Sequence, residues 1–150
     1  MSEMLGNQYF MARKYTDALA ELEPCLAEDP QNKSIKRKLV ICYTQTGKNQ
    51  KAMDLFIELV DEDIEFILTA DPIKDDCPCN ELVENLEKQN LPENGEFYTL
   101  SGILWLYCDL QSSIDVFEKA LTFDLENKTL QYLIKKLNFY KDQKSLKLSS

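Results

Sequence analysis

The sequence predicts an all-α protein of about seven or eight helices that pair as antiparallel hairpins. First, apolar residues recur at helical spacing, as in the run Ala18, Leu19, Leu22, Cys25 and Leu26. Second, a pattern of small and large apolar residues returns along the chain. Third, the 150 residues include four glycines and five prolines, which is too few for the many turns of an all-β chain.

The repeating pattern starts in the first 30 residues and returns twice. Its first copy consists of Leu5, Gly6, Tyr9, Ala18, Leu22, Cys25 and Pro30. A shift of 34 residues gives Leu39, Val40, Tyr43, Ala52, Phe56, Leu59 and Ile64. A further shift of 61 residues gives Leu100, Ser101, Leu104, Ser113, Phe117, Ala120 and Leu125. Almost every position keeps its class of side chain, so each copy predicts a similar helical hairpin.

Close packing of two antiparallel helices explains this pattern. Gly6 and Ala18 are small where the two helices of the first hairpin would approach each other. We expect turns between paired helices at residues 13–16, 46–49 and 109–112. Asp29 and Pro30 predict the end of one helix and the start of the next.

Two segments do not follow the pattern. Residues 67–93 interrupt it with an acidic, turn-like stretch at 71–79 and a predicted helix at 80–89. They form either a degenerate repeat or an inserted loop with a helix. Residues 127–143 predict one amphipathic helix, whose apolar residues are Leu130, Leu133, Ile134, Leu137, Phe139 and Tyr140.

The period of 34 residues resembles the tetratricopeptide repeat, most closely in the first copy with its Leu5, Gly6, Tyr9, Ala18 and Pro30. The resemblance implies one domain over residues 1–150, in which the hairpins stack into a right-handed superhelix. It places the elements at about 3–36, 33–66 and 94–127, with a solvating cap helix at 127–143. It also implies a protein that holds a partner peptide in a concave groove and catalyses no reaction.

In repeats that this chain resembles, the first helix of each hairpin lines the groove. The outward face of these helices predicts the partner-binding residues Asn7, Phe10, Met11, Arg37, Lys38, Ile41, Tyr98 and Trp105. Aromatic side chains and arginine are frequent binding anchors, and methionine adapts to varied shapes. The alternative for Phe10 and Trp105 is packing against a neighbouring repeat or the 67–93 segment, and for Trp105 core and groove are equal alternatives. Arg37 and Lys38 belong to a basic stretch, residues 30–53, with six cations and no acid, so we expect an acidic or amphipathic partner, with a solvated helix face as the alternative.

One subfamily of these repeats grips the C-terminal carboxylate of chaperones through five side chains. Asn7 agrees with that set, whereas Glu3, Lys38, Gly95 and Thr99 occupy the other four positions. The resemblance therefore does not imply binding to chaperone tails. A second hypothesis for the function is a small chaperone that shields secreted translocator proteins, a class that this chain resembles in length and acidity.

A third hypothesis is a metal- or redox-linked sensor in the loop before the predicted helix at 80–89. Its candidate ligands are two carboxylates and two thiolates, from Asp75, Asp76, Cys77 and Cys79. Structural zinc sites usually have two cysteine pairs, and this loop has one. We therefore expect no metal and no cofactor.

Composition narrows the function further. The net charge of −9 disfavours binding to nucleic acid. The chain has no histidine, no glycine-rich phosphate loop and no serine elbow, so no catalytic residue is predicted. Its longest apolar run, near residues 100–108, is far shorter than the roughly 20 residues that span a bilayer. We expect a cytoplasmic monomer or weak homodimer with free thiols, including Cys25 and Cys42.

Overall fold

The structure is a computed structural model that describes residues 2–70, 79–89 and 95–149. These residues form eight helices and no strand, which confirms the predicted all-α fold. The chain divides into two compact units, unit 1 (Met1–Asp76) and unit 2 (Cys77–Ser150). The sequence predicts a single domain, and the boundary between the units falls inside the predicted interruption at 67–93. Each unit is described by itself.

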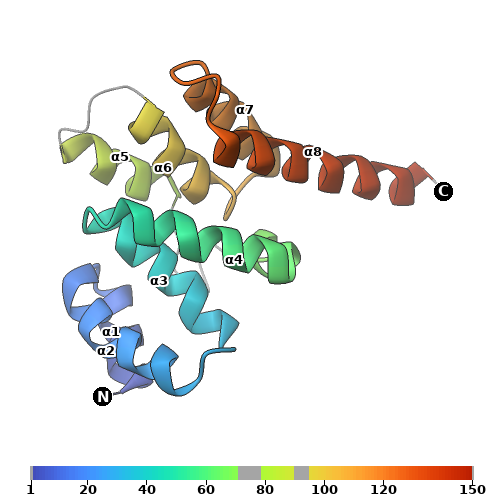
Figure 1. The fold of residues 1–150 in the computed structure, drawn as a ribbon. Coiled ribbons are helices and arrows are strands. Elements are labelled where there is room, and N and C mark those ends of the chain that lie inside the picture. The colour runs from blue at the N-terminus through green and yellow to red at the C-terminus, as the bar shows by residue number, and fades with distance from the viewer. Residues whose placement is uncertain (1, 71–78, 90–94, 150) are drawn as a thin grey trace. The chain divides into compact units, whose positions relative to one another are not determined.

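Unit 1 consists of two helical hairpins (Figure 1). Helix α1 (Glu3–Met11) pairs with α2 (Tyr15–Glu28), and α3 (Lys33–Gln45) pairs with α4 (Asn49–Leu68). Helix α2 also packs against α3. The connection between α2 and α3 contains Pro30, which confirms the predicted helix stop. The sequence predicts repeats at 3–36 and 33–66, and the helices of the two hairpins run over Glu3–Glu28 and Lys33–Leu68.

Side chains cap the first helix of each hairpin in unit 1. Ser2 Oγ accepts the backbone N–H of Leu5 at 3.1 Å, and Asn32 Oδ1 accepts that of Ile35 at 3.1 Å. These bonds satisfy donors that have no partner within the first turn of a helix. Gly47, in the turn before α4, has a φ of 76°, a left-handed conformation that glycine adopts without steric cost.

Gly6 marks the close approach of α1 to α2. A Cβ atom on Gly6 would lie 2.6 Å from Leu22 Cδ2 and 2.8 Å from Leu22 Cγ, which is too close for a side chain. The predicted need for a small residue here is confirmed. The other helices of unit 1 supply most of its buried apolar residues, including Ala18, Leu19, Leu22, Leu39, Val40, Ala52, Phe56 and Leu59.

Unit 2 contains the third hairpin and two flanking helices (Figure 1). Its helices are α5 (Cys79–Lys88), α6 (Gly95–Trp105), α7 (Leu110–Leu121) and α8 (Lys128–Ser149). Helix α6 pairs with α7, α5 packs against α6, and α8 packs against α7. The predicted helix at 80–89 and the predicted terminal helix are both present, and the terminal helix continues beyond residue 143.

The close approach in the third hairpin occurs one residue later than the repeat pattern predicts. A Cβ atom on Gly102 would lie 2.6 Å from Phe117 Cδ1, so Gly102 takes the role that the pattern assigns to Ser101. Gly102 is buried. Ser113 Oγ donates to the Gly102 carbonyl at 2.7 Å, which fixes α7 against α6 at this point.

A disulfide between Cys79 and Cys108 joins the start of α5 to the turn between α6 and α7. Their Cα atoms are 6.4 Å apart, and 29 residues separate them in the sequence. The expectation of free thiols is therefore wrong for this pair, because the fold brings together two cysteines that are distant in the chain. Cys25 and Cys42 are free, as predicted.

None of the described helices has the length and apolar character needed to cross a membrane.

Candidate functional site

The basic residues at the start of α3 lie against the end of α4. Lys33, Lys36 and Arg37 share one side of α3 because they are spaced three and four residues apart. Each contacts a group on α4, and the acids that pair with the two lysines come 22 to 30 residues later in the sequence. The basic stretch predicted from the sequence is thus matched by acids of the same unit.

Lys36 forms the most buried of these pairs and is not among the residues that the sequence predicts to bind a partner. Its side chain is 2% exposed. Its Nζ donates to Glu62 Oε1 at 2.7 Å and to Glu58 Oε1 at 3.2 Å. Burial by itself would lower the pKa of Lys36, but the hydrogen bonds and charges of the two glutamates outweigh burial and raise this pKa. The spacing of Lys36 from Lys33 and Arg37 is the signal that could have identified it.

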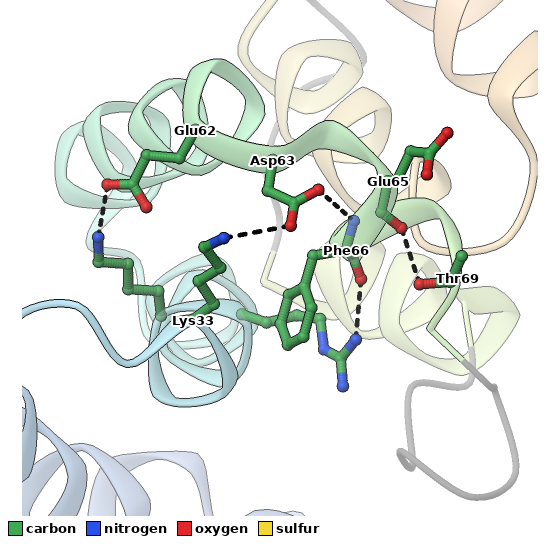
Figure 2. Close-up of polar contacts among 8 residues, drawn as sticks. Lys33, Glu62, Asp63, Glu65, Phe66 and Thr69 are labelled. Carbon is green, nitrogen blue, oxygen red and sulfur yellow. Dashed lines mark hydrogen bonds and ion pairs between the residues drawn. The ribbon is translucent and has the colours of Figure 1, made fainter.

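Helix α4 bends at Asp63, whose φ of −164° and ψ of 81° are extended and not helical. Asp63 Oδ1 accepts the backbone N–H of Phe66 at 3.2 Å, so it caps the segment of α4 that follows the bend. Its other oxygen, Oδ2, accepts a hydrogen bond from Lys33 Nζ at 3.2 Å (Figure 2). One carboxylate therefore begins the last segment of α4 and also ties it to α3.

Arg37 is occupied within unit 1. Its Nη1 donates to the Phe66 carbonyl at 2.9 Å, and its Cζ lies 4.3 Å from the centre of the Phe66 ring. A guanidinium on an aromatic face is a cation–π contact, and the hydrogen bond fixes its position. The predicted pairing of Arg37 with a partner's carboxylate does not agree with this placement, because the guanidinium already binds the bent end of α4. Lys38, the next residue, is half-buried.

Two predicted apolar anchors are also placed differently. Phe10 and Ile41 are each 1% exposed. The Phe10 ring packs edge-on against Tyr15, with the ring centres 5.8 Å apart. The expectation of exposed contact side chains is wrong at both positions, because both side chains are buried in the folded chain.

The outward face of α1 keeps Asn7 and Met11 and adds Met4. These three residues are spaced three and four apart, so they follow one side of the helix. Met4 is 71% exposed and Met11 is 64% exposed. Between them, Asn7 Oδ1 is buried and accepts no hydrogen bond from the described part of the chain. We call this set the α1 face.

The two predicted anchors on α6 belong to unit 2. The Tyr98 ring stacks on Phe123 with the ring centres 5.8 Å apart, and Lys119 Nζ lies 4.5 Å above the Tyr98 ring. Tyr98 and Trp105 are both half-buried, so each has an accessible part. The partial burial of Trp105 therefore does not distinguish packing in the core from a position in a groove.

The proposed metal loop has one described member. Asp75, Asp76 and Cys77 lie outside the described residues, whereas Cys79 is bonded to Cys108. A thiolate is the form of cysteine that binds a metal, and a disulfide has no thiolate. In the oxidised chain the candidate ligand Cys79 therefore has no thiolate to offer a metal.

A family comparison agrees with this geometry. Residues 9–63 match the family model described as tetratricopeptide repeat. Unit 1 therefore contains a tetratricopeptide repeat. The match covers α2, α3, the end of α1 from Tyr9 onward and most of α4, so it lies entirely in unit 1. Comparisons with curated proteins and with solved structures gave no match.

Tetratricopeptide repeats generally mediate contacts between proteins and are typically non-catalytic. In unit 1, the first helix of the first hairpin is α1, and α1 carries the exposed residues Met4 and Met11. The first helix of the second hairpin is α3, whose cations contact α4 of the same hairpin. The candidate partner surface in unit 1 is therefore the α1 face.

Proposed function

We propose that this chain is a non-catalytic interaction module that binds a segment of a partner protein across the α1 face. The observation that carries the proposal is the position of Asn7, whose buried Oδ1 has no described hydrogen-bond donor, between the exposed side chains of Met4 and Met11. Family membership supports the class of function, and the α1 face supports the location.

The two methionines favour a protein partner with apolar side chains. Methionine is unbranched and polarisable, so it packs against varied shapes. Large apolar side chains that are more than half exposed leave surface that a partner can remove from water. Because Met4 and Met11 are two helical turns apart, they can contact successive side chains of one bound segment.

Asn7 supplies the polar contact of this surface. A buried acceptor without a donor costs free energy in the isolated chain, about 1–3 kcal/mol by analogy with other buried polar groups. Asn7 as a whole is half-buried, so a rotation of its side chain on binding would bring Oδ1 to a backbone N–H of a bound segment and recover that cost. Asn7 therefore favours a peptide ligand, which has backbone N–H donors, over a purely apolar ligand.

The experiment is affinity capture from source lysate with the full chain, followed by quantitative mass spectrometry. The test variants are Met4→Ser with Met11→Ser, and separately Asn7→Ala. The matched control is Leu125→Ser, which removes a side chain that is 70% exposed in unit 2. We expect at least one captured protein to be retained by the control and lost by both test variants.

The stability of Asn7→Ala separates binding from folding. Removing an unsatisfied buried acceptor from a helix should leave the free energy of unfolding unchanged or raise it by about 1 kcal/mol, since alanine also has the higher helix propensity. A variant that is at least as stable but has lost the partner supports the proposal. Capture of the same proteins by all variants would overturn it.

The chaperone of secreted translocator proteins and the redox-linked sensor stay predictions. The Cys77/Cys79 pair has no support in the oxidised chain, since Cys79 pairs with Cys108. For the chaperone, co-purification with an exported apolar partner is the corresponding measurement.

A further inference from the structure

The outer side of α8 carries a line of exposed apolar residues in a stretch rich in lysine. Tyr132 is 44% exposed, Phe139 is 64% exposed and Leu146 is 66% exposed. They are spaced seven residues apart, so they follow one side of a helix for four turns. We call these three residues and the lysines beside them the α8 outer face; the lysines are Lys128, Lys135, Lys136 and Lys147.

The opposite side of α8 is already used within unit 2. Leu130, Leu133 and Leu137 are buried, and α8 packs against α7. Lys141 Nζ donates to Gln111 Oε1 at 2.5 Å, close to the residue where α7 begins. Beyond this contact α8 continues past α7 (Figure 1), and every residue from 141 to 147 is exposed. The outer face is thus held on a helix that the inner leucines anchor.

The charge of α8 is opposite to that of the chain. Residues 128–150 contain six lysines and one aspartate, whereas the whole chain has a net charge of −9. On the outer face lysines lie on both sides of the apolar line, and Lys136 Nζ lies 5.9 Å from the centre of the Tyr132 ring. Helices that pair as coiled coils have apolar residues at two positions of every seven, with charged residues on the flanks. The outer face has one such position, so it offers a partner helix a narrow apolar line with lysines on its flanks.

We propose that the α8 outer face binds an acidic helical segment of a partner protein. The partner's apolar side chains would cover Tyr132, Phe139 and Leu146, and its carboxylates would pair with the flanking lysines. This second surface lies in unit 2 and is independent of the α1 face. Two features of the face define this partner. The lysines require a partner of negative charge, and the apolar line, which is one residue wide, requires a narrow apolar contact.

Other occupants fit this face less well. Two copies of α8 side by side would bring two sets of six lysines together, and like charges at the flanks of paired helices repel. A membrane surface would require a broad apolar side, but Asp142 and Gln143 lie between Phe139 and Leu146 on the outer side of the helix. An acidic helix satisfies both the narrow apolar line and the lysines.

The test uses the full chain and a synthetic helical peptide about three heptads long, with leucine every seven residues and glutamate on both flanks. A matched peptide has lysine in place of glutamate. Fluorescence anisotropy of the labelled peptides measures affinity. We expect the acidic peptide to bind, with an affinity that falls as salt rises, and the basic peptide not to bind.

Variants locate the binding. Phe139→Ser with Leu146→Ser should weaken the acidic peptide about tenfold or more, and Lys135→Glu with Lys147→Glu should do the same. These positions are exposed, so circular dichroism should remain that of the parent chain. The controls are Leu125→Ser, an exposed apolar residue outside α8, and Met4→Ser with Met11→Ser, and both should leave the affinity unchanged.

Several outcomes would overturn the inference. They are no binding of the acidic peptide, equal binding of the two peptides, or binding that the α8 variants do not change. Binding of the chain to phosphatidylserine vesicles through Phe139 and Leu146 without binding of the acidic peptide would assign the face to membranes instead. Self-association that the same variants abolish, again without peptide binding, would assign it to a second copy. The capture experiment with the α1 variants tests the proposed function only. Its outcome does not change the interpretation of peptide binding by the α8 outer face.

Discussion

Lys36 Nζ lies 2.7 Å from Glu62 Oε1 although the lysine side chain is 2% exposed. The two glutamates that pair with Lys36 are more accessible, with 52% of the Glu58 side chain and 29% of the Glu62 side chain exposed. The contact is therefore unequal, because the cation has lost its hydration and the anions have kept part of theirs. Because the lysine is buried and the glutamates are partly exposed, substitutions of the lysine and of the glutamates should differ in their effect on the stability of unit 1.

Removing the anions should cost more than removing the cation. Glu58→Gln with Glu62→Gln leaves a buried ammonium without a charged partner, and we expect the free energy of unfolding to fall by about 2 kcal/mol or more. Lys36→Met replaces the cation with an apolar chain of similar length and leaves only partly exposed carboxylates, so the loss should be smaller. Urea unfolding followed by circular dichroism measures both. A larger loss for Lys36→Met would show that the charge pair does not govern stability here.

Alkaline pH should destabilise unit 1 through Cys42. Burial raises the pKa of the Cys42 thiol from its ordinary value of 9.0 to about 12. Above pH 9 the unfolded chain therefore loses this proton while the folded chain keeps it, so stability falls as pH rises, by at most about 1.4 kcal/mol per pH unit. At still higher pH the raised pKa values of Lys36 and Tyr43 act in the same direction.

The matched variant for this prediction is Cys42→Ala. Its stability should decrease less than that of the parent chain between pH 8 and pH 10, whatever its absolute stability at pH 8. Thiol labelling gives a second measurement in a Cys77→Ser background. Iodoacetamide should modify the half-buried Cys25 in the folded chain and reach the fully buried Cys42 only after unfolding. Equal labelling rates for the two thiols would contradict the prediction.

Reduction of the disulfide should destabilise unit 2. The Cys79–Cys108 bond spans 29 residues, and a closed loop of this size lowers the entropy of the unfolded chain by an amount equivalent to about 3–4 kcal/mol. Trp105, the single tryptophan, lies in unit 2, so its fluorescence follows this unit in urea. Cys79→Ser with Cys108→Ser should lower the midpoint, and Cys25→Ser serves as the control. A midpoint that dithiothreitol does not change would mean that the bond does not form.

The glycines at the two close approaches should differ in their tolerance of alanine. A Cβ atom on Gly102 would meet the Phe117 ring at 2.6 Å, and a ring cannot move away by a change at one terminal carbon. Gly102→Ala should therefore cost about 1–3 kcal/mol despite the better helix propensity of alanine. Gly6→Ala should cost less, because the methyl end of Leu22 can rotate.

Gly95→Ala is the control, since its Cβ atom would lie 3.4 Å from Phe123 Cβ and 3.7 Å from the Ala120 carbonyl. Thermal unfolding should give the order Gly95→Ala, Gly6→Ala, Gly102→Ala from mildest to most severe. The reverse order of Gly6→Ala and Gly102→Ala would contradict the assignment of Gly102 to the close approach.

The helices were predictable because their signals are local. The spacing of Leu130, Leu133 and Leu137 indicates both a helix and its buried side, and Pro30 marks a helix stop within a few residues. In the third hairpin the close approach of the two helices occurs at Gly102, one residue after the predicted position Ser101. Both residues are small, so the sequence pattern fits either position. Local sequence thus predicts which elements form, and the side chains that meet across a hairpin determine their exact register.

The candidate site was less predictable because its contacts are distant in sequence. Arg37 follows a run without acids, so it was predicted to bind a partner, but the bend at Asp63 brings the Phe66 carbonyl to it. Phe10 was assigned to an outward face, and it packs on Tyr15 across the turn that follows α1. Met11 is exposed on the outward face of α1, where its position depends on the local helix alone.

The disulfide of unit 2 also closes a covalent ring. The ring runs from Cys79 to Cys108 and contains the whole of α5 and α6. Lys88, the exposed last residue of α5, lies inside it. A single tryptic cut after Lys88 would therefore open the ring without releasing a fragment. The cut chain would migrate as one band on a denaturing gel without reductant and as two bands with it.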